Sequence, residues 1–170
     1  MDSQNHSDHQ LENSSLNYCR PRHVVVFVVR INSDGKPQWL LMRRCGKYLN
    51  GNWQMVTGRI EANESTVSAA KRELAEETGL VADLFYNADF VEMFWEKSKD
   101  VIQFGPVFLA MVSNTAEVRL SPSEHDQFRW VGTEMASDML DFRGQKQALN
   151  HIVATFIDKT PPEFFLVNDQ

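Results

Sequence analysis

An unbroken apolar run at residues 24–29, Val-Val-Val-Phe-Val-Val, places the strongest constraint on the fold of this chain. β-Branched and aromatic side chains favour extended backbone. A strand with one face in water would alternate apolar and polar residues, and this run does not. It therefore predicts a strand buried on both faces, which needs other elements packed on each side of its sheet.

The rest of the pattern supplies those elements. Strands are expected over residues 39–44, 84–96, 101–112 and 127–131, and helices over 65–78, 133–140 and 143–157. Ser65 is placed as an N-cap of the first helix and Gly79 as the residue after its end. This order indicates an α/β or α+β fold with a mixed sheet between helices. Residues 1–17 are polar and predict a flexible tail, which leaves one domain over residues 18–170.

Composition excludes several classes of protein. The 170 residues carry 17 Lys and Arg against 23 Asp and Glu, a formal net charge of −6, which argues against a nucleic-acid partner. No stretch has the length of a membrane span, and the first residues do not resemble a signal peptide. Cys19 and Cys45 are the only cysteines. We therefore expect a cytoplasmic protein without a membrane partner.

Three acids on the first predicted helix oppose its stability. Glu73, Glu76 and Glu77 fall on one face, where like charges three or four residues apart repel. Lys71 and Arg72 would neutralise part of this charge, and a hard divalent cation would neutralise more, because clustered carboxylates suit Mg²⁺ or Mn²⁺. The alternative for these acids alone is a solvated acidic helix face.

The wider spacing around these acids resembles the Nudix box, G-x5-E-x7-R-E-U-x-E-E-x-G-U, where U is aliphatic. All nine specified positions are met, by Gly58, Glu64, Arg72, Glu73, Leu74, Glu76, Glu77, Gly79 and Leu80. The resemblance implies an α/β/α sandwich with a mixed β-sheet between helices. It also implies an enzyme that hydrolyses a nucleoside diphosphate linked to another group, with Mg²⁺, or Mn²⁺ in its place, acting on the phosphates and the water.

The resemblance also assigns roles within the box. It implies that Glu76 and Glu77 are metal ligands and that Glu73 is a further ligand or the general base. Glu64 and Arg72 are expected to form an ion pair that braces the loop before the helix. Gly58 is expected to let the backbone approach the metal site. Gly79 is expected to serve the turn.

A second pattern lies just before the box. Trp53-Gln54-Met55-Val56-Thr57-Gly58 is similar to the Trp-Gln-x-Val-Thr-Gly form of the bacterial dihydroneopterin triphosphate pyrophosphatases. The Glu124-His125 pair also matches that group, which implies a metal-ligand or base role for Glu124; the alternative is a loop acid. The catalytic candidates are therefore Glu73, Glu124 and Arg72. This chain departs from the group at Asn50-Gly51-Asn52 and Phe94-Trp95-Glu96.

Other side chains are candidates to bind substrate. Arg43, Arg44 and Lys47 suit phosphate oxygens, with a solvated strand end as the alternative. Thr57 and Gly58 belong to the same expected site. Aromatic residues that would stack on a base or pterin, or else pack in the core, are Trp53, Phe94 and Trp95.

These residues predict a Mg²⁺-dependent pyrophosphohydrolase acting on a pterin or nucleoside triphosphate. The alternatives are hydrolysis of dinucleoside polyphosphates or other nucleoside diphosphate derivatives, and a non-catalytic nucleotide-binding module. The partner expected is a small phosphorylated molecule, and unpaired strand edges leave a homodimer open. Bound Mg²⁺ would reconcile the net charge of −6 with a polyphosphate substrate.

Overall fold

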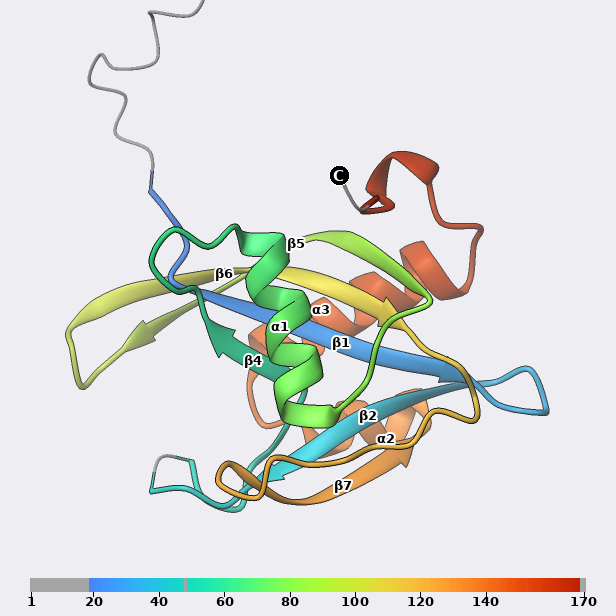
Figure 1. Cartoon of the computed structure of the whole chain (residues 1–170), viewed down its shortest axis with the longest axis horizontal. Coiled ribbons are helices and arrows are strands. Elements are labelled where there is room, and N and C mark those ends of the chain that lie inside the picture. The colour runs from blue at the N-terminus through green and yellow to red at the C-terminus, as the bar shows by residue number, and fades with distance from the viewer. Residues whose placement is uncertain (1–18, 48, 169–170) are drawn as a thin grey trace, which may run out of the picture.

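The computed structural model describes residues 19–47 and 49–168, and the tail expected over residues 1–17 lies outside them. In this part of the chain the strands form one sheet with helices on both sides (Figure 1). The strands are β1 His23–Ile31, β2 Pro37–Arg44, β3 Trp53–Gln54, β4 Val56–Arg59, β5 Leu84–Glu96, β6 Val101–Met111 and β7 His125–Val131. The helices are α1 Thr66–Thr78, α2 Thr133–Met139 and α3 Arg143–Ile152, followed by a π-helical turn Val153–Ile157 and a 3-10 turn Glu163–Phe165.

The sheet is mixed, as predicted. Its main order is β3-β2-β1-β6-β5, with β4 also paired to β1 and β7 to β2. β1 runs parallel to β6 and antiparallel to β2 and β4. β1 is therefore central, and each half of its length has neighbours on both sides.

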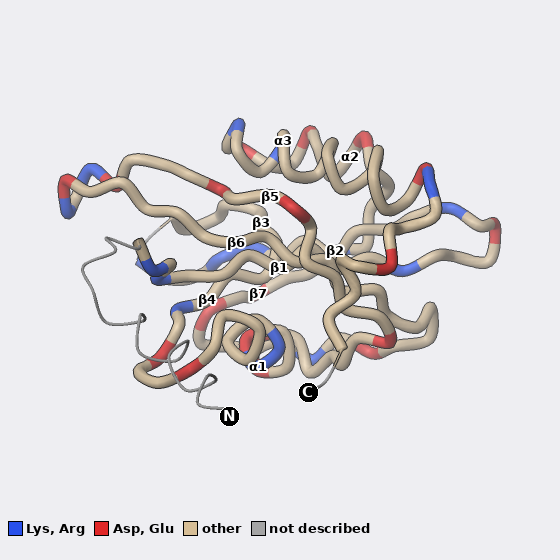
Figure 2. Tube along the Cα trace, turned by 90° about the horizontal axis from the view of Figure 1, so that it is seen from above, with Lys and Arg blue, Asp and Glu red and all other residues tan. Residues whose placement is uncertain are grey.

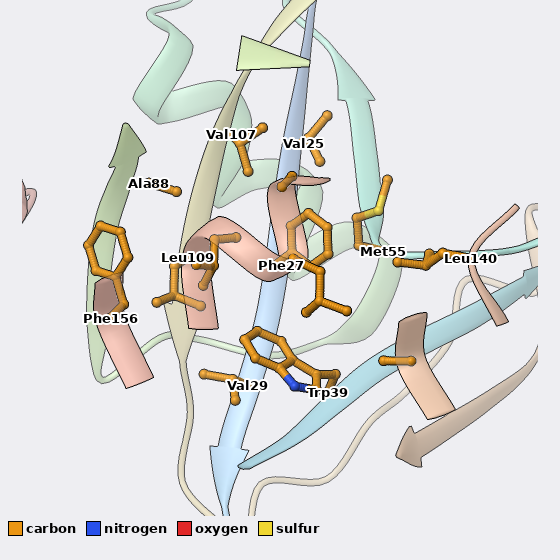
Figure 3. Close-up of a cluster of buried hydrophobic side chains, with 14 of the residues drawn as sticks. Val25, Phe27, Val29, Trp39, Met55, Ala88, Val107, Leu109, Leu140 and Phe156 are labelled. Carbon is orange, nitrogen blue, oxygen red and sulfur yellow. The ribbon is translucent and has the colours of Figure 1, made fainter. Parts of the chain in front are cut away.

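β1 is buried on both faces because its alternate side chains enter two separate cores. Val25, Phe27 and Val29 lie in one core, together with Trp39 and Leu109 (Figure 3). The alternating residues Val24, Val26 and Val28 point to the opposite face and enter the second core. This confirms the inference drawn from the apolar run.

The two cores lie under different helices. Figure 2 shows α1 on one side of the sheet and α2 and α3 on the other. Ala70 and Leu74 of α1 pack into the core of Val24, whereas Leu149 and Ile152 of α3 pack into the core of Val25. The predicted sandwich with a mixed sheet between helices is confirmed. None of the helices in the described residues has the length and apolar character that crossing a membrane requires.

The ends of α1 follow the capping pattern. The Ser65 side chain accepts a hydrogen bond from the Ser68 backbone N–H at 3.1 Å. Gly79 has φ of 69°, and its N–H donates to the Ala75 carbonyl. A residue without Cβ adopts this left-handed backbone at little cost, so Gly79 ends the helix.

Two segments differ from the sequence prediction. The segment around Trp53 and Thr57 forms β3 and β4, which are too short to give a recognisable alternation. The last helix, expected over residues 143–157, is α-helical only to Ile152, and residues 153–157 form a π-helical turn. Such turns are rare and occur mostly as single turns joined to α-helices, so the helical periodicity does not distinguish them.

Candidate active site

Arg72 on α1 is the centre of an ion-pair network. Its Nε donates to Glu64 Oε1 at 2.9 Å and its Nη2 to Glu64 Oε2 at 3.0 Å. Its Nη1 donates to Glu73 at 2.8 Å and to Glu76 at 2.9 Å, and its Nη2 also donates to the Arg59 carbonyl at 2.8 Å. The expected ion pair between Glu64 and Arg72 is present. It joins the loop before α1 to the helix, and its hydrogen bonds lower the pKa of Glu64.

Gly58 on β4 faces Glu73 on α1. A Cβ placed on residue 58 would overlap Cγ, Cδ and Oε1 of Glu73. The missing side chain is therefore what allows the carboxyl to lie against β4. Burial raises the pKa of Glu73, and the hydrogen bond from Arg72 opposes that rise.

Glu77 is the most deeply buried acid of the box. The residue is 1% exposed, and neither carboxyl oxygen has a hydrogen-bond partner. Burial, together with the charges of Glu124 and Glu73, raises the pKa of Glu77 to about 9. The Arg44 charge and the nearby Thr57 N–H, which does not reach hydrogen-bond geometry, oppose the rise. A buried carboxylate without a partner is unfavourable, so this position calls for a cation.

His125 and Arg44 lie beside Glu77. His125 Nδ1 is 3.9 Å from Glu77 Oε2, and His125 Nε2 is 3.4 Å from Gln54 Nε2. Burial and the Arg44 charge lower the pKa of His125 to about 4, so its ring is neutral at pH 7. The Nε of Arg44 is buried without a hydrogen-bond partner. The Arg44 guanidinium therefore lies close to the acids and still has an N–H group that could donate a hydrogen bond.

Glu124 and Glu76 complete the acidic group from two sides. Glu124 is on the exposed loop before β7, and its charge acts on both Glu73 and Glu77. The Glu76 side chain is also exposed and pairs with Arg72. The structure thus brings all four predicted metal ligands to one end of α1 and the neighbouring loop.

The four acids are not arranged as a ready-made metal site. In the described part of the chain, no three His, Cys, Asp or Glu side chains are placed to hold one ion together. Arg72 holds Glu73 and Glu76, and a cation would compete with it. The unpartnered oxygens of Glu77 and the all-oxygen donor set nonetheless fit Mg²⁺ or Mn²⁺.

The predicted substrate-binding residues have different surroundings. Arg43 is engaged with Asp126, its Nε and Nη2 donating at 2.8 and 2.6 Å, so it is not free to bind phosphate in this structure. Lys47 is exposed near the end of β2. Trp53 packs against the core, and the Arg129 guanidinium lies 5.0 Å from its ring centre. Thr57 Oγ1 accepts a hydrogen bond from Gln54 at 3.3 Å.

Phe94 and Trp95 are not core residues. They are 41% and 56% exposed near the end of the β5–β6 hairpin. Phe94 lies 5.7 Å from the His23 ring. Exposure keeps their predicted stacking role open.

Sequence reasoning missed three buried polar side chains, His125, Glu92 and Gln145. Alternate residues of β5 are apolar at Tyr86, Ala88, Phe90 and Phe94, and Glu92 breaks that series. An acid in this otherwise apolar series indicates a buried charge, so the sequence could have singled out Glu92. For His125 the Glu124-His125 pair was the signal, but its contact with Glu77 could not be predicted because Glu77 is distant in sequence.

The sequence model of the NUDIX domain matches residues 21–152. An octanoyltransferase of Myxococcus xanthus is 36% identical over 132 residues, which are 76% of this chain and 36% of that protein. This chain thus spans about a third of that relative's length. The asymmetrical bis(5′-nucleosyl)-tetraphosphatase of Sus scrofa is 34% identical over 104 residues, 58% of this chain and 67% of that enzyme.

The structure of the E. coli dihydroneopterin triphosphate pyrophosphohydrolase shares this fold. It matches with a TM-score of 0.67 at 20% identity, over 81% of this chain and 97% of that one. The family match covers most of the chain and agrees with the box and the sandwich. This chain therefore belongs to the Nudix hydrolases, which generally use divalent metals such as Mg²⁺.

Proposed function

We propose that this protein is a Mg²⁺-dependent pyrophosphohydrolase that cleaves a phosphoanhydride bond of a pterin or nucleoside triphosphate, giving the monophosphate and pyrophosphate. The observation that carries the proposal is Glu77, a buried carboxyl with two unpartnered oxygens, beside the charges of Glu73 and Glu124. When bound, Mg²⁺ supplies charge neutralisation on the phosphates and orients water for attack.

Each acidic side chain has a task in this proposal. Glu76, Glu77 and Glu124 hold the metal ion, and Glu73 is a further ligand or accepts the proton of the attacking water. Arg72 restrains Glu73 and Glu76, so both carboxyls would have to be shared with a bound ion. Because Glu73 lies against Gly58, its position is fixed by the backbone of β4.

Two basic residues are proposed to meet the phosphates. Arg44 has an unpartnered Nε near Glu77, and Lys47 is exposed beyond the end of β2. Arg43 would first have to leave Asp126. A guanidinium matches phosphate oxygens in geometry and charge.

The substrate proposal rests on two similarities. The Trp53-to-Gly58 segment and the shared fold with the E. coli dihydroneopterin triphosphate enzyme favour a triphosphate. The Sus scrofa tetraphosphatase supports a second candidate, a dinucleoside polyphosphate. Both reactions cleave a phosphoanhydride, and either would use the same acidic site in this proposal.

Mass spectrometry of the products over a substrate panel tests the proposal. The panel contains dihydroneopterin triphosphate, the ribo- and deoxyribonucleoside triphosphates and diadenosine tetraphosphate, each with Mg²⁺ or with EDTA. We expect monophosphate and pyrophosphate from a triphosphate, only with Mg²⁺. Glu77→Gln should lower turnover more than about a hundredfold. The matched control is Glu117→Gln, because the Glu117 side chain is 84% exposed.

Other outcomes contradict the proposal. Preferred cleavage of diadenosine tetraphosphate to AMP and ATP would favour the second candidate. Absence of turnover on the whole panel, with nucleotide binding that is independent of Mg²⁺ in calorimetry, would identify a non-catalytic binding module.

A further inference from the structure

His125 and Glu77 are buried side chains that face each other without forming a hydrogen bond. In the described part of the chain, His125 Nδ1 and both carboxyl oxygens of Glu77 are buried and have no hydrogen-bond partner. Nδ1 lies 3.9 Å from Glu77 Oε2, which is longer than a hydrogen bond. Because buried polar atoms are nearly always paired, this close approach of two unpartnered groups requires an explanation.

The other side of the His125 ring is held by Gln54 on β3. Gln54 Nε2 lies 3.4 Å from His125 Nε2 and also donates to Thr57 Oγ1 at 3.3 Å. An amide nitrogen only donates, so His125 Nε2 accepts from Gln54. A neutral imidazole has one N–H, which is then on Nδ1. The ring therefore directs its proton toward the Glu77 carboxyl.

Main-chain hydrogen bonds fix the distance between the two residues. The Ser121 N–H donates to the Glu77 carbonyl at 3.1 Å, and the His125 N–H donates to the Ser121 carbonyl at 3.1 Å. On the other side, the Cys45 N–H donates to the Glu124 carbonyl at 2.9 Å. The loop before β7 is thus attached both to the end of α1 and to the end of β2. Only about 1 Å separates Nδ1 and Oε2 from hydrogen-bond length, a change that rotation of the side chains can supply.

Packing alone does not explain a histidine at position 125. An apolar ring would fill the same space without leaving a buried nitrogen unpaired. A carboxylate that binds a metal ion, in contrast, has to be held in one orientation, and hydrogen bonds from neighbouring groups commonly supply this. The geometry of His125 toward Glu77 fits that task.

We propose that His125 is a positioning residue, which holds the Glu77 carboxyl in the orientation of a metal ligand by donating from Nδ1 to Oε2. Oε1 of Glu77 then stays available to the ion. Gln54 and Thr57 hold the ring from behind, which gives these two residues of the Trp53-to-Gly58 segment a common task. The inference rests on the metal-ligand role proposed for Glu77.

Two substitutions at position 125 distinguish positioning from packing. His125→Phe keeps a ring in this space but removes both nitrogens. His125→Asn leaves a cavity but keeps an N–H group two bonds from Cβ, as Nδ1 is. We would measure Mn²⁺ affinity without nucleotide, by electron paramagnetic resonance of the free ion. His125→Phe should weaken binding by about 10- to 100-fold. His125→Asn should stay within about threefold of the wild type.

A packing role predicts the opposite order, because the cavity in His125→Asn destabilises the fold. Melting temperatures in EDTA record that cost separately from the affinity. His151→Phe is the matched control, since His151 is a half-buried histidine on α3, on the other side of the sheet from α1 (Figure 2). Wild-type affinity in His125→Phe, or weaker affinity in His125→Asn than in His125→Phe, would overturn the inference.

Nitrogen-15 NMR of the wild-type histidine rings provides a test that needs no variant to fold. The His125 ring, assigned through its backbone, should show a protonated Nδ1 and an unprotonated Nε2, both in EDTA and with Mg²⁺. A proton on Nε2 would overturn the inference, because Nε2 could then not accept from Gln54.

Glu77→Gln separates this inference from the proposed function. If Mn²⁺ affinity falls in Glu77→Gln but not in His125→Phe, the metal role of Glu77 stands and the inference is overturned. If Glu77→Gln binds Mn²⁺ like the wild type, the ion binds elsewhere and both proposals fail. Turnover on the substrate panel is scored separately, so an inactive protein with the expected affinities would contradict the proposed reaction and leave the role of His125 intact.

Discussion

Gly58 and Glu73 share one space, because a Cβ on residue 58 would fall on the carboxyl group of Glu73. The two residues come from β4 and α1, which pack against each other on the Val24 side of the sheet. The glycine therefore has a specific steric role in placing a candidate catalytic carboxyl. This role is separate from the conformational freedom for which glycines are selected in turns.

Gly58→Ala should displace Glu73 and lower turnover by about a hundredfold, since small misplacements of a catalytic group have effects of that size. The loss should appear mainly in kcat, measured with Mg²⁺ on the best substrate of the panel. Gly132→Ala is the matched control, because nothing lies within 4 Å of its Cβ position. Equal turnover in both alanine variants would contradict the steric role.

Glu77→Gln should separate metal binding from folding. Without metal the folded wild type must keep Glu77 protonated at pH 7, because its pKa is raised to about 9, and this lowers its stability. The neutral amide avoids that cost, so the variant should melt at or above the temperature of the wild type. Added Mg²⁺ should raise the melting temperature of the wild type, because an ion that binds only the folded state stabilises it. The variant should not respond. A melting temperature that rises equally in both proteins would place the ion elsewhere.

Arg72→Lys keeps the positive charge but loses the two-pronged contact with Glu64. One ammonium group cannot reproduce the hydrogen bonds to Glu64, Glu73 and Glu76 together. We expect a melting temperature several degrees lower and reduced turnover. Arg43→Lys alters a similar two-pronged pair with Asp126 on the surface and should change stability less. The prediction fails if the two lysine variants melt alike.

The sequence predicted the layers of this fold because its strongest signals are local. Six apolar residues in succession specify a strand with two buried faces, and Ser65 and Gly79 mark the ends of α1. The spacing of the box also placed Glu64 beside Arg72, since eight residues span the loop and two turns of helix.

Contacts between segments that are distant in the sequence could not be predicted. Nothing in the pattern indicates that His125 lies beside Glu77 or that Asp126 engages Arg43, because both contacts depend on how β7 pairs with β2. The steric fit of Gly58 and Glu73 likewise depends on the distance between β4 and α1.

Glu92→Gln should make stability depend less on pH. Burial raises the pKa of Glu92 from its ordinary 4.5 to about 7 in the folded protein. Between these values the folded state keeps a proton that the unfolded state releases, so stability falls as pH rises from about 4.5 to about 7 and then levels off. Glutamine does not titrate, so the variant does not lose stability over this pH range. Its advantage should therefore be absent below pH 4.5 and complete above pH 7, at most about 3 kcal/mol.

Urea denaturation of both proteins at several pH values measures this difference. Ionisable residues on β1, β5 and α3 include His23, Asp89, Glu96, Arg143, Lys146 and His151, and none forms an ion pair with Glu92 among the described residues. They are common to both proteins, so their titration cancels in the difference. A structural role for Glu92 predicts the opposite, a variant that is less stable at pH 7. Greater stability of the variant at pH 7 would show that the fold tolerates Glu92 rather than requires it.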